Sequence, residues 1–252
     1  RARFIDLYAE QPFQIGDWTL QLATEIARIT GTTTRLQSYN SRLGMWVGSL
    51  GAVGELALTS PDERFTAHLR TGYASADADP DDGFTQEFRF DPNYNVGMVL
   101  FDELMGAVEV GTYNRITDPA ISGEPPNGID AHVTEGSVRG AIYLQPVLEV
   151  HPLPWLEARL GGVFAWNTSP VREPFNSYRN GGVPTNHLGE PTEGYHLGTE
   201  LDWALEFGDP EQNLSPLRLN PQLILQGGHL QASSDMGGET LHLLMATGRV
   251  RW

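Results

Sequence analysis

The chain has 252 residues, a formal net charge of −16 at pH 7 and no cysteine. The acidic balance argues against nucleic acid as a partner, because phosphate binding needs a basic surface. The lack of cysteine excludes disulfides and thiolate metal sites. No run of about eighteen apolar residues occurs, which argues against a helical membrane protein. The length suits one domain over residues 1–252, and the 28 glycines and 17 prolines suit many strands joined by turns.

Alternation of apolar and polar residues with a period of two recurs along most of the chain, as in strands with two different faces. It predicts strands over residues 17–27, 42–58, 65–73, 138–150, 156–166, 194–207, 217–225 and 239–252. Residues 1–10 and 106–116 are compatible with one or two further strands, and Pro12 and Gly16 mark a turn. A short helix over residues 20–29 is the competing interpretation there, because the apolar residues also have helical spacing.

The connections between the predicted strands are of two kinds. Those near residues 60 and 208 and at His151–Pro154 are short turns, whereas residues 74–131 and 168–193 form long loops. The two kinds alternate along the chain, as in outer-membrane barrels, where short periplasmic turns alternate with long extracellular loops. A soluble sandwich has no reason to segregate its connections in this way.

The first long loop is too long for an idle connection, and such loops tend to be functional. Its acidic start, Asp77–Asp82, predicts a solvated loop, with a calcium site as the alternative because alternating aspartates supply oxygen ligands. Apolar residues with helical spacing follow: Val96, Val99, Leu100, Leu104 and Val108. We expect a short helix here, folded into or over a barrel mouth as a constriction, and exposed loop over residues 116–130.

The segment 194–207 shows the two predicted faces most clearly. Its odd positions, from Tyr195 to Phe207, are mainly apolar, whereas its even positions carry three carboxylates and a histidine. A carboxylate-rich face is a poor protein core. The simplest geometry therefore sets the apolar face against lipid and the charged face in a wet lumen.

The two-faced repeat, the loop asymmetry and the terminal Trp252 after Gly248–Arg251 resemble Gram-negative outer-membrane β-barrel proteins. The resemblance implies a transmembrane antiparallel up-and-down β-barrel in the bacterial outer membrane, surrounded by outer-membrane lipid. It also implies a C-terminal strand read by the barrel-assembly machinery. Residues 88–97 with Leu100–Asp102 are similar to a segment of alginate-export-type barrels. Because such barrels have more strands, this resemblance implies that the chain is a C-terminal portion of a larger barrel, although its acidic balance argues against an alginate-like solute.

Charged side chains on the expected inner face are the candidate pore-lining residues, because rows of opposed charge select solutes by charge and size. They are Glu55, Arg64, His68, Arg70, Arg139, Glu149, Glu157, Arg159, His196, Glu200, Asp202, Glu206, Arg218, Arg249 and Arg251. Aromatic residues on the opposite face are the candidate lipid-facing girdle. They are Tyr73, Phe164, Trp166, Tyr195, Trp203, Phe207 and Trp252.

A cation site among His196, Glu200, Asp202 and Glu206 is an alternative interpretation of these charges. Residues two apart on a strand are roughly 7 Å apart, however, which is too far for their backbone positions alone to share one ion. We therefore expect neither a metal nor a cofactor. The sequence also contains no nucleophile elbow, no His-Glu-x-x-His pair and no phosphate-binding glycine loop, so we expect no enzyme.

The sequence thus predicts a porin-like outer-membrane channel for passive diffusion of small or charged solutes through a charged lumen. A non-conducting barrel that serves as a structural or interaction protein is the alternative. A secreted soluble β-sandwich that binds carbohydrate through Trp155, Trp166 and Trp203 is the third hypothesis. A homo-oligomer or a larger membrane complex is compatible with both membrane hypotheses.

Overall fold

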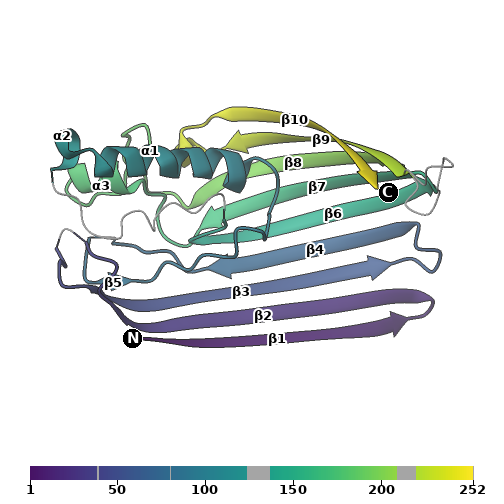
Figure 1. The fold of residues 1–252 in the computed structure, drawn as a ribbon, viewed down its shortest axis with the longest axis horizontal. Coiled ribbons are helices and arrows are strands. Elements are labelled where there is room, and N and C mark those ends of the chain that lie inside the picture. The colour runs from purple at the N-terminus through teal and green to yellow at the C-terminus, as the bar shows by residue number, and fades with distance from the viewer. Residues whose placement is uncertain (39, 80, 124–136, 209–219, 252) are drawn as a thin grey trace.

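The computed structural model describes residues 1–38, 40–79, 81–123, 137–208 and 220–251. Its strands are β1 (Ala2–Ile15), β2 (Trp18–Thr33), β3 (Met45–Thr59), β4 (Phe65–Ala74), β5 (Phe84–Thr85), β6 (Ala141–Leu153), β7 (Leu156–Asn167), β8 (His196–Phe207), β9 (Asn220–Ala232) and β10 (Thr240–Arg251). Its helical elements are the π-helix η1 (Leu100–Met105), α1 (Gly106–Thr117), α2 (Pro119–Ser122), α3 (Pro174–Arg179) and the 3-10 turn η3 (Ser234–Met236) (Figure 1).

These strands form one sheet in the order β1-β2-β3-β4-β6-β7-β8-β9-β10, and every pairing on this path is antiparallel. The short β5 pairs in parallel with β3, with Trp46 opposite Phe84. Within the described chain β1 and β10 each have a single partner strand, so the sheet is open (Figure 1). The predicted up-and-down antiparallel sheet is confirmed.

The structure corrects the sequence prediction at the first hairpin. β1 continues through Pro12 to Ile15, and the turn is confined to Gly16 and Asp17, where Gly16 has a φ of 62°. Proline is tolerated in β1 because β1 is an edge strand, on which an outward-facing backbone position needs no donor. β2 is a strand throughout, so the competing helix over residues 20–29 is wrong.

The connections segregate to opposite ends of the sheet (Figure 1). Two-residue turns join β1 to β2 and β6 to β7, and a tight turn at Ser60–Arg64 joins β3 to β4. The long connections and the helices lie at the other end, which we call the loop end. β6 runs through His151 to Leu153, so the turn predicted to start at His151 starts at Pro154.

The predicted strand over residues 106–116 is wrong, because these residues lie in α1, which continues directly from η1. The helical spacing is confirmed from Leu100 onward. Ile116 is buried in α1 and α2 follows, so the exposed loop predicted from residue 116 is also wrong at its start; residues 124–130 lie outside the described residues. No helix of the described part is long and apolar enough to cross a membrane.

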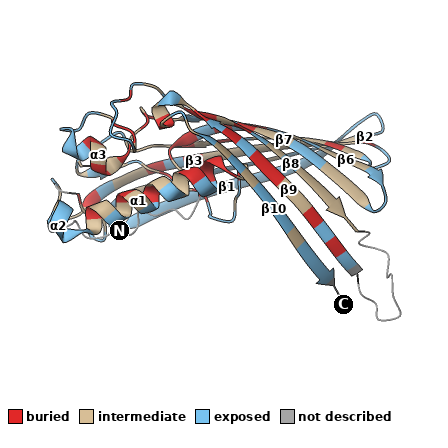
Figure 2. Ribbon diagram, turned by 90° about the horizontal axis from the view of Figure 1, so that it is seen from above, coloured by how far each residue is buried: buried red, intermediate tan, exposed pale blue. Residues whose placement is uncertain are grey.

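The hydrophobic core lies between the concave side of the sheet and residues 84–117, which we call the plug. The plug contributes Phe88, Phe90, Val96, Val99, Leu100, Phe101 and Leu104, and the sheet contributes Ala74, Ala141, Tyr143, Val163, Ala165, Leu197, Leu230 and Ala232. Buried residues concentrate toward the helix-bearing end, whereas β1 is exposed along its whole length (Figure 2). The core therefore supports mainly the part of the sheet nearer the loop end.

A register shift between β7 and β8 turns the first residues of β8 over. Ala165 pairs with Gly198, but the next residue, Trp166, pairs with His196. Leu197 consequently points into the core, whereas His196 packs on Trp166, with ring centroids 5.9 Å apart, on the convex side. The inner-face position predicted for His196 is thus corrected, because strict alternation does not survive a β-bulge.

Candidate functional site

The two faces of the sheet differ in chemistry. Charged residues predicted for the inner face occupy concave positions: Glu55, His68, Arg70, Glu149, Glu157, Arg159, Glu200, Asp202, Glu206 and Arg249. Large apolar residues are exposed at convex positions: Leu22, Ile26, Leu50, Leu69, Ile142, Leu144, Leu148, Leu160, Phe164, Trp166, Leu201, Trp203, Leu223, Leu244 and Val250. An ordinary soluble surface would have the opposite distribution.

The predicted aromatic girdle follows the convex face in most positions. Five of its members alternate outward in their strands: Tyr73, Phe164, Trp166, Trp203 and Phe207. Tyr195 immediately precedes β8 and is exposed, and Trp252 lies outside the described residues.

A cavity of about 600 Å³ runs along the concave face beside the plug. Strands from both halves of the sheet line it, with Tyr8 from β1, Glu55 from β3, Arg70 from β4, Arg159 from β7 and Asp202 from β8. Basic side chains and carboxyl groups therefore line one space together with apolar residues such as Met98 and Trp203. Such a space suits solutes that carry charge or hydrogen-bonding groups.

Arg70 ties the cavity wall to the plug. Its Nε lies 3.1 Å from Glu55 Oε1, and one terminal nitrogen donates to the Asn95 carbonyl at 3.2 Å. The guanidinium also lies 4.7 Å from the centre of the Tyr94 ring, which is cation–π distance. Tyr94 in turn donates to Glu55 and shares a 2.8 Å hydrogen bond with Tyr143. These contacts join the plug to β3, β4 and β6.

Glu200 fastens the plug to β8. Its carboxylate, only 1% exposed, accepts the backbone N–H groups of Met98, Val99 and Leu100 at 2.5, 2.8 and 2.7 Å. These donors open the first helical turn, where a negative charge is favourable. Gly97 precedes them with a φ of 73°, and a Cβ there would lie 2.9 Å from the carboxylate oxygens. The predicted pore-lining Glu200 is therefore an anchor shielded from solvent.

Arg139 makes a second attachment of the plug. Its terminal nitrogen lies 2.7 Å from Glu87, and its Nε pairs with Glu109 of α1. All three side chains are largely buried, so the pairing is protected from water. Arg139 lies in the bridge next to Arg89, just before β6. Like Glu200, it holds the plug and does not face open space.

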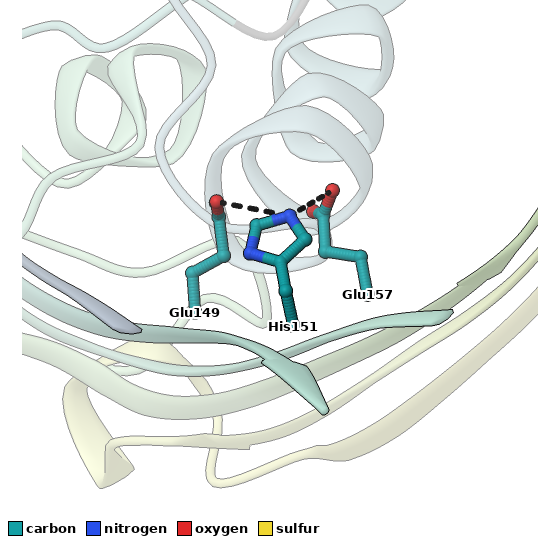
Figure 3. Close-up of side chains that lie close together, drawn as sticks. All are labelled: Glu149, His151 and Glu157. Carbon is teal, nitrogen blue, oxygen red and sulfur yellow. Dashed lines mark ion pairs between the residues drawn. The ribbon is translucent and has the colours of Figure 1, made fainter. Parts of the chain in front are cut away.

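Three side chains meet at the short-turn end of the concave face (Figure 3). Glu149 and His151 come from β6 and Glu157 from β7, and one ligand atom from each lies within 4.8 Å of the others. Arg159 Nε forms an ion pair with Glu157 Oε1 at 2.6 Å, and a terminal nitrogen of Arg159 lies 3.5 Å from Glu206 Oε2. Of the described residues, this is the one group whose nitrogen and oxygen atoms converge in the manner of a metal site.

The acidic loop Asp77–Asp82 is folded on its own side chains. The N–H groups of Asp79 and Asp81 each donate to the aspartate two residues earlier, and the Asn40 amide donates to Asp81 at 2.6 Å. These bonds use carboxylate oxygens that a calcium ion would need. Burial raises the pKa of Asp77 to about 6, with the charge of Glu87 adding to the effect. The loop is thus more than a solvated connection.

A smaller cavity of about 360 Å³ lies at the loop end between the plug and the second long loop. Asp77, Arg172 and Asn186 are among its polar lining residues. The Arg172 Nε and the Asn186 Nδ2 atoms are buried and have no hydrogen-bond partner. Charged side chains, among them Glu87, Arg139 and Glu173, line the same cavity.

The remaining predicted pore-lining residues are not gathered into the site. Arg64 lies in the tight turn after β3, pairs with Asp62 and is exposed. Arg218 lies outside the described residues, as does the side chain of Arg251. The predicted charged residues that lie on the concave face therefore come from β3, β4, β6, β7, β8 and β10.

Sequence reasoning missed Tyr94, Tyr143 and His151. Alternation along its strand places Tyr143 on the charged face. Its hydrogen bond to Tyr94, however, joins residues 49 positions apart, and no local sequence pattern indicates such a contact. The sequence predicts His151 to lie in a turn. Its spacing of two residues from Glu149 could have indicated that both side chains lie on one face, because residues two apart on a strand share a face.

No protein-family model matches the chain, and no curated protein sequence matches it.

Proposed function

We propose that the sheet is the wall of a transmembrane β-barrel in the bacterial outer membrane, and that the protein is a porin-like channel for passive diffusion of small charged or polar solutes. The plug is its constriction. The proposal rests on one observation above all: the exposed convex face is apolar while the concave face is charged. Monomeric soluble proteins rarely expose apolar patches larger than a few hundred Å², and lipid is the partner that suits a sheet apolar over nine strands.

The strand lengths support a membrane location. A strand that crosses a bilayer needs about 9–11 residues when tilted. The strands of the sheet path range in length from 10 residues in β4 to 16 residues in β2. They are therefore long enough to cross lipid and to extend beyond it at the loop end, where the helices lie.

The open edges support closure by further strands. The path has nine strands, so eight antiparallel pairings separate β1 from β10 and these two run in the same direction. Pairing them directly would make a parallel seam, whereas an odd number of added strands would keep the barrel antiparallel. We propose that such strands come from the rest of a longer polypeptide, of which this chain is a C-terminal portion. The exposed β1 is the edge on which they would pair.

A non-conducting barrel with a structural or interaction role is the second candidate. The observation in its favour is the tight attachment of the plug through Glu200 and Arg139, which fills the loop-end half of the concave face. The carbohydrate-binding sandwich has no such support, because the described strands make one sheet where a sandwich has two facing sheets.

Single-channel recording in a planar bilayer separates the two candidates. The full-length protein should give steady current, and a salt gradient should show cation preference, since the chain carries 32 acidic and 16 basic residues. Deleting residues 98–117 should raise the conductance. Silence from protein that is folded and inserted would refute the channel and leave the non-conducting barrel.

A further inference from the structure

Two carboxylates and one imidazole converge at the short-turn end of the concave face, at the β6–β7 hairpin (Figure 3). We propose that Glu149, His151 and Glu157 bind a divalent transition-metal ion of the Zn²⁺ type. This site lies at the end of the sheet opposite the plug. It does not depend on whether the protein conducts.

The hairpin brings the three residues together by strand geometry. Glu149 and His151 are two apart on β6, so their side chains leave the same face. Glu149 pairs across the hairpin with Arg159, and Glu157 is two residues before Arg159 on the same face of β7. A register shift between Val150 and Leu153 lets the hairpin close around His151. The two-residue turn that follows fixes both strands.

The distances within the group suit a metal better than direct hydrogen bonds. The Nε2 atom of His151 lies 3.4 Å from Glu157 Oε2 and 3.9 Å from Glu149 Oε1. Charge-assisted hydrogen bonds are shorter, about 2.7–2.9 Å. Two ligands bound to a tetrahedral ion at about 2.0–2.1 Å lie roughly 3.4 Å from each other. The observed spacing therefore leaves room for an ion among the three atoms.

Neighbouring side chains orient the carboxylates toward that space. Arg159 Nε holds Glu157 Oε1 at 2.6 Å, so Glu157 Oε2 is the oxygen presented to His151. The other oxygen of Glu149, Oε2, lies 3.9 Å from His68 Nε2, which supplies either a fourth ligand or an outer partner. Outer partners of this kind fix the geometry of metal ligands.

The donor set selects the class of ion. Imidazole nitrogen with two carboxylates suits zinc and its neighbours, whereas calcium and magnesium take oxygen ligands. Two carboxylates and a neutral imidazole also balance the double charge of the ion. The Nδ1 atom of His151 is buried without a hydrogen-bond partner. Binding through Nε2 would fix the ring in the tautomer that keeps its proton on Nδ1.

A histidine pair elsewhere supplies a matched comparison. His229 and His242 face each other across β9 and β10 on the convex side, with their Nδ1 atoms 3.1 Å apart. Among the described residues, this pair does not belong to a group of three or more potential metal ligands. If zinc bound through histidine alone, this pair would be the better site.

The test is titration of Zn²⁺ into the full-length protein in detergent after chelator treatment, followed by calorimetry. Wild type should bind in a saturable manner. His151→Ala should lower the association constant by about tenfold or more, because losing even an outer partner of a metal costs that much. Glu157→Gln, which keeps shape and volume, should do the same, and His242→Ala should bind as wild type does. Co²⁺ should give visible absorption bands in wild type that Glu157→Gln lacks.

Three results would overturn the proposal. Wild-type protein with no saturable binding is the first. The second is loss of binding in His242→Ala with binding retained in His151→Ala, which would assign the zinc to the convex pair. The third is unchanged binding in Glu157→Gln. Circular dichroism of each variant checks that the strands have formed, and if His151→Ala fails to fold, Glu157→Gln alone decides.

Discussion

Replacing Glu200 should release the plug from the sheet. In Glu200→Ala the N–H groups of Met98, Val99 and Leu100 lose their acceptor, and the last two residues are buried. Each hydrogen bond to a charged group contributes about 1.5–3 kcal/mol, and breaking a buried charged arrangement costs about 3–5 kcal/mol. Because the three bonds share one carboxylate, we expect about 3–4 kcal/mol of lost plug stability.

Hydrogen exchange of the full-length protein measures this loss directly. A change of about 3–4 kcal/mol in local opening corresponds to exchange faster by roughly two to three orders of magnitude. The effect should be confined to the plug, while β2, β3 and β9 exchange as in wild type. Glu200→Gln should lie in between, since an amide keeps one acceptor oxygen. Glu206→Gln is the control, because it alters another carboxyl on the same face of β8 and keeps all three bonds. Unchanged exchange in the plug of folded Glu200→Ala would refute the anchoring role.

Two further predictions concern the plug entry and the acidic loop. Gly97→Ala should destabilise the plug by about 1–3 kcal/mol, because alanine is strained at a φ of 73° and its Cβ would meet Glu200; plug exchange equal to wild type would contradict it. Asp77 has a folded pKa of about 6 against about 3.9 unfolded, so the folded state holds the extra proton and stability should rise as pH falls from about 7 to about 4. Asp77→Asn should remove this pH dependence and raise the free energy of unfolding by on the order of 1–2 kcal/mol near pH 7. If the stability of the variant instead changed with pH in parallel with wild type across that range, the result would count against a buried Asp77 carboxyl.

The sequence predicts the sheet well because its signal is local. Alternation along each strand depends only on neighbouring residues. It predicts eight of the strands, and it predicts which face of the sheet carries residues such as Arg70 and Arg159. β1 was only weakly marked, since as an exposed edge strand it packs on β2 alone. The sequence of residues 106–116 is ambiguous, because a short apolar pattern fits both the helical period of 3.6 residues and the strand period of two.

The site was harder to predict because its contacts are distant in the sequence. Parity set Glu200 on the inner face, but its partners lie about 100 residues earlier, and no local pattern shows that a carboxylate is capping a helix. The β-bulge at Ala165–Trp166 reversed His196 and Leu197, which strict alternation cannot anticipate. Local rules thus predict faces, and only the fold shows which inward charges are anchors.

In the proposed barrel, the convex face should meet lipid and the concave face should meet water. The protein lacks cysteine, so single cysteines report without background. In protein reconstituted into liposomes, Leu144→Cys on the convex face of β6 should resist a water-soluble maleimide, whereas His68→Cys on the neighbouring strand β4, which lines the concave cavity, should react. Detergent-free denatured protein should react at both positions. Equal, rapid labelling of both cysteines in folded, reconstituted protein would contradict the membrane barrel.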